Sequence, residues 1–343
     1  MRARERGVAL VTAVLIVAVV AALATSLALG QQVWLRQAQN LADLAQAEKL
    51  RRGAFEFAAV MLALDGRNVR TSQTDDLTEE WAQPLPPLPV DGGSVLIAIA
   101  DAQGLFNLNN VAQTPPQNRP PQGGGAPVNY AAMYRALLGY AGIEPARIDV
   151  LTDALIDWID PDSNVRPAGA EDLDYLGHDP PYRAANQPLR SVDELRLIKG
   201  YTPEIVEKLR PYVVAITPGG SPAQSTAVPI NVNTAPAPVL AALTNRPLSE
   251  IEPLVERRAR QPFKNAEELG AALGGQAPPA GSYDVKSSYF IVTVETRIGR
   301  TQRRTEALLH RPIGGNQKAT VLWYRQPAFQ IVLDEDESDD DAS

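Results

Sequence analysis

The chain has 343 residues with 32 lysines and arginines, 40 acidic residues and a formal net charge of −8. It contains no cysteine and two histidines, which excludes disulfide frameworks, thiol nucleophiles and zinc sites built from thiolates or several imidazoles, so a bound metal would have to prefer oxygen ligands. Seven acids lie between Asp334 and Asp341, and the nearly neutral remainder lacks the basic excess of a nucleic-acid-binding protein.

The N-terminus is predicted to be a membrane anchor that continues as a long helix. Residues 8–29 are 22 uncharged and mostly apolar residues. At about 1.5 Å per residue they reach roughly 33 Å, enough to span a bilayer core. Apolar or small residues recur at helical spacing as far as Leu64, and no proline occurs before Pro84. We expect one helix over residues 8–64, transmembrane over 8–29 and amphipathic in its second half.

The residues before this helix resemble the leader of a type IV prepilin. A basic stretch ends at Gly7, and the pair Gly7-Val8 resembles a prepilin peptidase site that would remove residues 1–7; a plain N-terminal anchor is the alternative. Most pilin-like proteins carry glutamate at the fifth mature position, which here is Thr12. That buried carboxylate compensates the amino terminus of a neighbouring subunit, because an unpaired charge in apolar surroundings is costly. A subunit without it suits the end of a filament better than its middle.

Strands are expected on both sides of a helical block. Residues 94–100 indicate a strand, 101–104 a hairpin turn and 105–108 the returning strand. Helices are expected at 129–140 and 145–159, and S-x-x-E capping boxes at Ser191 and Ser249 mark the start of two more. Further strands are expected at 289–296, 304–310 and 320–324.

This order predicts an α+β fold. The long N-terminal transmembrane pilin helix would be followed by a pilin-like antiparallel sheet formed from residues 65–110 and 283–330. A large inserted all-α domain would occupy residues 111–282, because a helical block between strands of one sheet has the form of an insertion. The acidic tail, residues 331–343, is expected to be disordered.

Several segments resemble the minor pseudopilin K family of the type II secretion system. They are the RGVAL start with threonine at mature position five, DAQGLFNLN at 101–109, DALIDWIDPD at 153–162, GAED at 169–172, YRAAN at 182–186, SVDELRLIKG at 191–200 and INVNTA at 230–235. The resemblance implies processing by prepilin peptidase, a single-pass protein of the bacterial inner membrane with a periplasmic head, and assembly with minor pseudopilins I and J at the pseudopilus tip. It also implies contact with secreted cargo or the outer-membrane secretin, and calcium in the helical domain.

The spacing of acids after residue 153 predicts a calcium loop. Asp160, Asp162, Asn164 and Glu171 occupy positions 1, 3, 5 and 12 of a 12-residue loop. Position 6 is Val165 instead of glycine, and we expect no clear helix after the loop, so it is not an EF-hand. Dense carboxylates repel one another unless a cation compensates them. The predicted ligands of a structural Ca²⁺ are Asp157, Asp160, Asp162, Asn164, Glu171 and Asp172, with Asn186 as a further candidate; the alternative is a solvated acidic loop.

Two other functions are considered. Residues 231–273 resemble helix-hairpin-helix segments, which would make the chain a pilin-like DNA-uptake component, but the connection at 244–248 lacks glycine and only Arg257, Arg258 and Arg260 form a basic cluster. No nucleic-acid partner is therefore expected. A hydrolase would need a base beside the paired acids, and no nucleophile or nucleotide-binding motif occurs, so the chain is not expected to be an enzyme.

Overall fold

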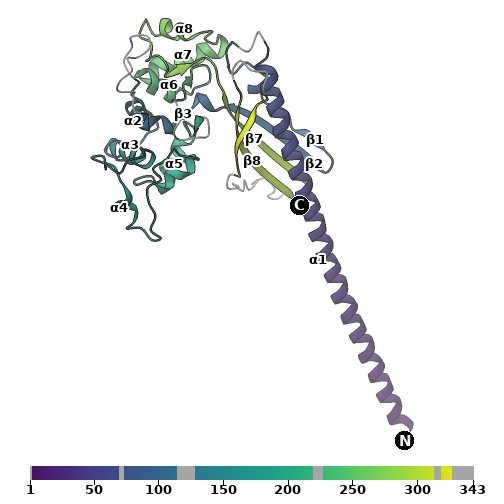
Figure 1. Ribbon diagram of the computed structural model, residues 1–343. Helices are drawn as coiled ribbons and strands as arrows, with labels where there is room; N and C mark the ends of the chain where they lie inside the picture. The colour runs from purple at the N-terminus through teal and green to yellow at the C-terminus, as the bar shows by residue number, and fades with distance from the viewer. Residues whose placement is uncertain (1, 69–72, 114–127, 219–226, 313–317, 327–343) are drawn as a thin grey trace, which may run out of the picture.

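A single helix dominates the computed structural model, which describes residues 2–68, 73–113, 128–218, 227–312 and 318–326. Helix α1 (Arg2–Asp65) projects from the head as a long rod (Figure 1). It contains the expected helix over 8–64 and extends it by about two turns at its N-terminus. Gly7 lies in this extension, and Val8 is the first residue of the expected helix. The surroundings of both residues are outside the described part of the structure.

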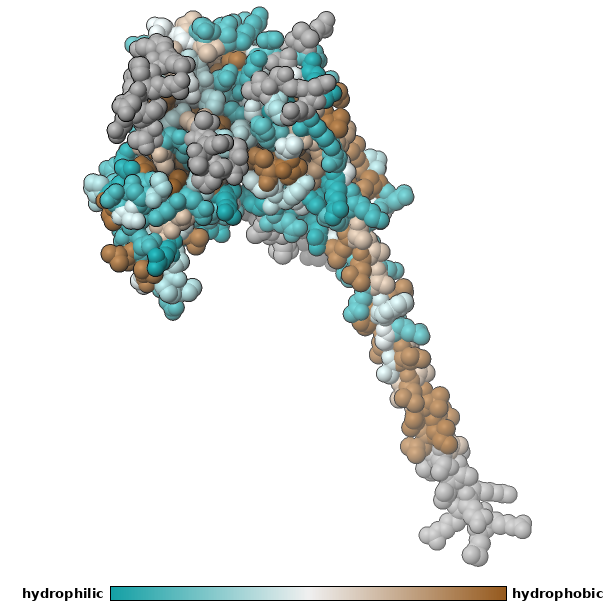
Figure 2. All heavy atoms as spheres, in the orientation of Figure 1, coloured by the Kyte–Doolittle hydropathy of each residue, from teal (hydrophilic) through white to brown (hydrophobic). Residues whose placement is uncertain are grey.

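In the first half of α1, the side chains that the structure describes, from residue 13 onward, are exposed. Val14, Leu23 and Trp34 are all more than half exposed, and an apolar surface runs along the rod (Figure 2). Within the described residues, α1 is the helix that is long and apolar enough to cross a membrane. An apolar surface of this length is stable in lipid and costly in water, so α1 is consistent with a single-pass anchor.

The second half of α1 packs on a five-stranded antiparallel sheet of order β1-β2-β7-β8-β9. The strands are β1 (Leu88–Val90), β2 (Gly93–Asp101), β7 (Tyr289–Ile298), β8 (Thr301–His310) and β9 (Thr320–Arg325). Alternate residues of β2 face the helix, as the period of two in a half-buried strand requires. Phe55 and Leu62 of α1 meet Ile97 and Val292 in this core, and Ala58 between them lets the helix approach closely.

The expected hairpin after β2 is wrong. Residues Ala102–Gly104 form a short 3-10 helix, and β3 (Phe106–Asn107) pairs in parallel with β4 (Val213–Val214) instead of returning along β2. The buried carboxylate of Asp101 causes the departure. Its Oδ2 accepts hydrogen bonds from Asn231 Nδ2 at 2.8 Å, Thr234 Oγ1 at 2.6 Å and Ser287 Oγ at 2.6 Å. These partners tie the end of β2 to the helical region, and β7 takes the place of the returning strand.

The chain between β2 and β7 is mainly helical. Its elements are the 3-10 helices η3 (Leu108–Ala112) and η4 (Val192–Leu197), the helices α2 (Tyr130–Tyr140), α3 (Pro145–Ile159), α4 (Asp172–Tyr175), α5 (Pro203–Leu209), α6 (Ala237–Thr244), α7 (Leu248–Arg260) and α8 (Ala266–Ala272), and the paired short strands β5 (Ile230–Asn231) and β6 (Tyr283–Asp284). They surround one large apolar core that includes Phe106, Tyr134 and Leu155. This region lies to one side of the sheet and of α1 (Figure 1).

The two expected capping boxes have different outcomes. Glu194 Oε1 accepts from the Ser191 amide at 3.0 Å, as expected, although the helix that follows is a 3-10 helix. The box at Ser249 is wrong, because α7 already begins at Leu248 after Pro247. Proline restricts its own φ angle and has no amide hydrogen. Pro247 can therefore precede the first residue of α7 without a side-chain cap.

Three buried asparagines connect the segment after β3 to distant parts of the helical region. Asn109 Oδ1 accepts from the Leu189 amide at 2.8 Å, and Asn109 Nδ2 donates to Leu189 O at 3.0 Å. Asn110 makes the same two-way pairing with Val228, and Asn107 pairs with Ile216. Each side-chain amide accepts from the N–H and donates to the C=O of one residue, as a paired strand would. The backbone polar groups of these loops are therefore hydrogen-bonded although the loops are not part of a sheet.

Candidate metal centre

The acidic loop follows the most buried part of α3. The Asp157 side chain, in the last turn of that helix, is 0% exposed. Its Oδ2 accepts from the amides of Arg166 at 3.1 Å and Ala170 at 3.0 Å, so the carboxylate folds the loop back over itself. Gly169 fits against this oxygen only because it lacks a side chain: a Cβ there would lie 1.9 Å from Asp157 Oδ2. The loop is therefore built around Asp157.

Five oxygen atoms in this region are buried and have no hydrogen-bond donor. They are Asp157 Oδ1, Asp160 Oδ1, both Oε atoms of Glu171, and Asn186 Oδ1. Buried acceptors without a donor are rare in folded proteins, because each one loses its hydration without replacement. A hard cation coordinated by oxygen removes that cost. The unpaired atoms belong to four of the seven residues predicted as ligands, and they are the kind of oxygen donor that Ca²⁺ prefers.

Of the other three predicted ligands, Asp162 and Asp172 accept hydrogen bonds from the protein, and Asn164 donates two. Asp162 Oδ1 accepts from the Asn164 amide at 2.8 Å and from Asn164 Nδ2 at 2.7 Å, and both residues are exposed. Asp172 accepts from the Ala184 amide at 3.1 Å and from Arg183 at 3.2 Å. The expectation that no helix follows the loop is wrong, because Asp172 begins the single-turn helix α4. Asp174 supports that turn by accepting from the Glu171 amide at 3.3 Å.

The electrostatics of the loop also favour a cation. Burial first, and the charges of Asp157 and Asp160 second, together raise the pKa of Glu171 to about 7. Burial likewise raises the pKa of Asp157 and of Asp160. Each carboxylate is thus less stable as an anion here than in water, since desolvation and like charges both penalise ionisation. A divalent cation between them would reverse both effects.

Aromatic rings lie against the same loop. Trp158 follows Asp157 and meets the Tyr175 ring edge-on with centroids 5.1 Å apart. Tyr175 stacks on Tyr182 at 5.3 Å. Trp158 and Tyr175 are buried. Because Trp158 is the residue after Asp157, it places an intrinsic fluorophore beside the candidate centre.

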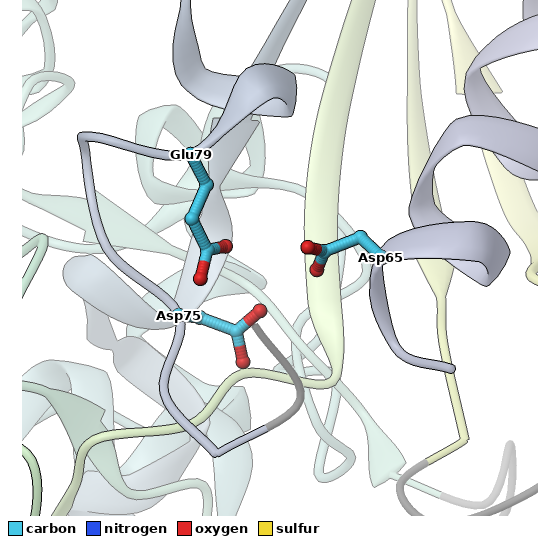
Figure 3. Close-up of side chains that lie close together, drawn as sticks. All are labelled: Asp65, Asp75 and Glu79. Atoms are coloured by element: carbon cyan, nitrogen blue, oxygen red, sulfur yellow. The ribbon is translucent and has the colours of Figure 1, made fainter. Parts of the chain in front are cut away.

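A second acidic group was missed by the sequence analysis. Asp65, Asp75 and Glu79 point toward one another where α1 ends (Figure 3), and one carboxylate oxygen of each lies within 4.8 Å of the others. Among the described residues this group meets that spacing and the loop acids do not. Arg311 already compensates it, pairing with Asp65 at 2.6 Å and with Asp75. Sequence gave no signal for this pairing, because Arg311 is 246 positions from Asp65.

The basic cluster in the region resembling helix-hairpin-helix segments is partly buried. Arg258 is almost inaccessible and donates to the carbonyl oxygens of Val232 and Ala235. Burial lowers its pKa to about 10. Its role here is to hold the turn after β5, which is unlike a phosphate contact at an exposed hairpin.

The architecture of the chain defines its class. A long N-terminal apolar helix packed by its second half on an antiparallel sheet is a pilin-like fold, and here a helical region lies between strands β2 and β7.

Comparison with known proteins then gives the family. The family described as Type II secretion system (T2SS), protein K matches residues 104–218 and 230–289. The type II secretion system protein K of Pseudomonas aeruginosa is 33% identical, with 94% of this chain and 93% of that protein covered. The Pectobacterium carotovorum protein of the same description is 32% identical, with 97% and 99% covered. The chain therefore belongs to the protein K family of the type II secretion system and is a minor pseudopilin of that system.

A solved structure has the same fold. In the crystal structure of the GspK-GspI-GspJ complex from the enterotoxigenic Escherichia coli type 2 secretion system, one chain matches with a TM-score of 0.66 and 25% identity. The match covers 84% of this chain and 99% of that one.

Proposed function

We propose that this protein caps the tip of the periplasmic pseudopilus and helps to initiate its assembly for protein export. The observation that carries the proposal is the helical region between β2 and β7, which widens the head well beyond the sheet at the far end of α1 (Figure 1). A filament subunit needs a free upper surface for the next subunit, and a head of this width obstructs it. Thr12, which replaces the usual carboxylate, removes one half of the stacking contact and agrees with an end position.

The proposed partners are minor pseudopilins I and J of the same system. The similar E. coli structure is a complex of three such chains, and the near-complete coverage of its matched chain supports a comparable assembly here. Prepilin peptidase would cleave between Gly7 and Val8, which would leave Val8 as the amino terminus in the inner membrane. Secreted cargo and the outer-membrane secretin are further proposed contacts of the head.

Three measurements test this assignment. Co-purification of the full-length chain with its system's I and J proteins from detergent should yield a stable ternary complex, and gold-labelled heads should appear at filament ends by electron microscopy. Labels spaced along the filament shaft would contradict the tip position. Mass spectrometry of the membrane-extracted protein should find Val8 as the first residue in cells with active peptidase, and an intact leader there would contradict processing.

We further propose that the loop between α3 and α4 binds a structural Ca²⁺. The oxygens without donors on Asp157, Asp160, Glu171 and Asn186 would hold it. Asp162, Asn164 and Asp172 would shape the loop, and the two aspartates would add negative charge. Bound Ca²⁺ supplies two positive charges and accepts six to eight oxygen ligands. The chain's own contribution is to close residues 160–171 over the end of α3, with the Asp157 carboxylate already held by two amides.

Metal titration of the full-length chain in detergent tests this site. Tb³⁺, which substitutes for Ca²⁺, should give emission sensitised by the adjacent rings of Trp158 and Tyr175, and Ca²⁺ should displace it. Asp157→Asn and Glu171→Gln should weaken binding at least about ten-fold, since each removes a charged ligand. Asp162→Asn is the matched control, because its remaining oxygen still accepts from the Asn164 amide. Equal losses in all three variants would contradict the proposed ligand set.

A further inference from the structure

The guanidinium of Arg166 lies beside the candidate calcium ligands. Its Nε is 3.3 Å from Asp157 Oδ1, and its Nη2 is 3.4 Å from Asp160 Oδ2. Both contacts are longer than the roughly 2.7–2.9 Å of a charge-assisted hydrogen bond. The arginine side chain is 43% exposed while the Asp157 carboxylate is fully buried. The guanidinium therefore covers the buried oxygens from the solvent side without binding them tightly.

Arg311 shows what a permanent counter-ion looks like in the same molecule. Its side chain is 7% exposed, pairs with Asp65 and Asp75, and donates to Ser287 O at 2.8 Å. Its guanidinium also lies 4.7 Å from the centre of the Phe290 ring. Each of these contacts would have to break for Arg311 to leave. Arg166 has no comparable enclosure, so its head group can move into water at small cost.

The backbone of Arg166 is fixed independently of its side chain. Its amide donates to Asp157 Oδ2 at 3.1 Å, whereas the guanidinium pairs with Oδ1. The side chain can therefore swing outward while the loop keeps its fold and Asp157 keeps its orientation. One guanidinium also compensates the site incompletely, because the two oxygens of Glu171 have no hydrogen-bond donor.

We propose that Arg166 is a tethered counter-ion that competes with Ca²⁺ for Asp157 and Asp160. The inference rests on the calcium site of the proposed function. Without metal, the guanidinium offsets part of the repulsion between the loop acids. A Ca²⁺ ion carries twice that charge and also reaches Glu171, so its binding expels the guanidinium into solvent. Arg166 thereby lowers the apparent calcium affinity and holds the loop together before the ion arrives.

The test compares Arg166→Gln with Arg183→Gln in the full-length chain in detergent. Arg183 pairs with Asp172 at the start of α4 and is 73% exposed, so its removal changes the net charge equally without touching Asp157, Asp160 or Glu171. Calorimetric titration with Ca²⁺ should show affinity increased about two- to five-fold for Arg166→Gln, the scale of losing a competing surface ion pair. Arg183→Gln should change it less than about two-fold. Arg166→Lys keeps the charge on a shorter donor and should lie between wild type and Arg166→Gln.

Thermal unfolding separates competition from an ordinary structural role. Arg166→Gln should lower the melting temperature in EDTA and leave it unchanged with saturating Ca²⁺, whereas a structural contact would be lost in both states. Calcium affinity of Arg166→Gln that equals or falls below wild type overturns the competition. Wild-type protein that is folded and gives no heat with Ca²⁺ overturns the metal site itself, so the two failures are distinct.

Discussion

Glu79 should make the folded protein lose stability as the pH rises. Glu79 is 8% exposed. Burial, and to a lesser extent the charge of Asp65, together raise its pKa from 4.5 to about 8. The hydrogen bond donated by Trp81 Nε1 opposes this rise only in part. Between these two pH values the folded state therefore binds a proton that the unfolded state releases, and stability falls with increasing pH.

The magnitude follows from the two pKa values. One pKa unit corresponds to about 1.36 kcal/mol, so moving from 4.5 to about 8 corresponds to about 5 kcal/mol of folding free energy once the pH exceeds both values. Small rearrangements that admit water would reduce the loss, and we expect about 2–5 kcal/mol. Glu79→Gln stays neutral at every pH, and its amide oxygen can still accept from Trp81. The variant should match wild type at about pH 5 and exceed its stability by about 2–5 kcal/mol at about pH 9.

Urea unfolding of the full-length chain in detergent, followed by tryptophan fluorescence across this pH range, measures the difference. Other acids titrate in the same window, including Asp75, whose pKa is raised to about 6 by burial. For that reason the quantity of interest is the variant's stability minus that of wild type at each pH. Glu80→Gln, a neighbouring exposed position, is the control and should stay within about 0.5 kcal/mol throughout. A Glu79→Gln curve parallel to wild type would refute the reasoning.

Three further changes have expected outcomes. Arg311→Met should cost about 3–5 kcal/mol in urea unfolding, because the buried Asp75 carboxylate would lose the guanidinium that compensates its charge; a cost below about 1 kcal/mol would contradict that role. Asn109→Ala should cost about 2–3 kcal/mol in thermal unfolding, since the polar groups of Leu189 lose both donor and acceptor, and an unchanged melting temperature would show that water replaces the amide. Ca²⁺ at about 100 times its dissociation constant should stabilise wild type by about 2.7 kcal/mol and Glu171→Gln by much less; equal stabilisation would place the ion elsewhere.

The sequence predicted those elements whose signal is local. The strands at Gly93–Asp101 and Tyr289–Ile298 and the helix at Pro145–Ile159 follow from alternation or helical spacing within a few residues. The hairpin expected after Asp101 failed for the opposite reason. The partners that redirect the chain, Asn231 and Ser287, lie 130 and 186 positions away, and no short window contains them.

The candidate metal centre was only partly accessible from spacing. Acids at calcium-loop intervals identify the region, but spacing does not reveal which oxygens the loop consumes itself. Asp162 is occupied by Asn164, whereas Glu171 keeps both oxygens without a donor. The role proposed for Arg166 could not be predicted from sequence, because an arginine in an acidic loop is common. The proposal depends on the distances from its guanidinium to Asp157 and Asp160.

The continuity of α1 has a mechanical consequence. Its 64 residues form one unbroken helix, which at about 1.5 Å per residue is a strut about 96 Å long. No interruption separates the exposed apolar segment from Phe55 and Leu62, which pack on the sheet. A force along the helix axis, or a torque on its N-terminal half, is therefore transmitted to the head through one continuous helix. Little of that work is lost to bending on the way.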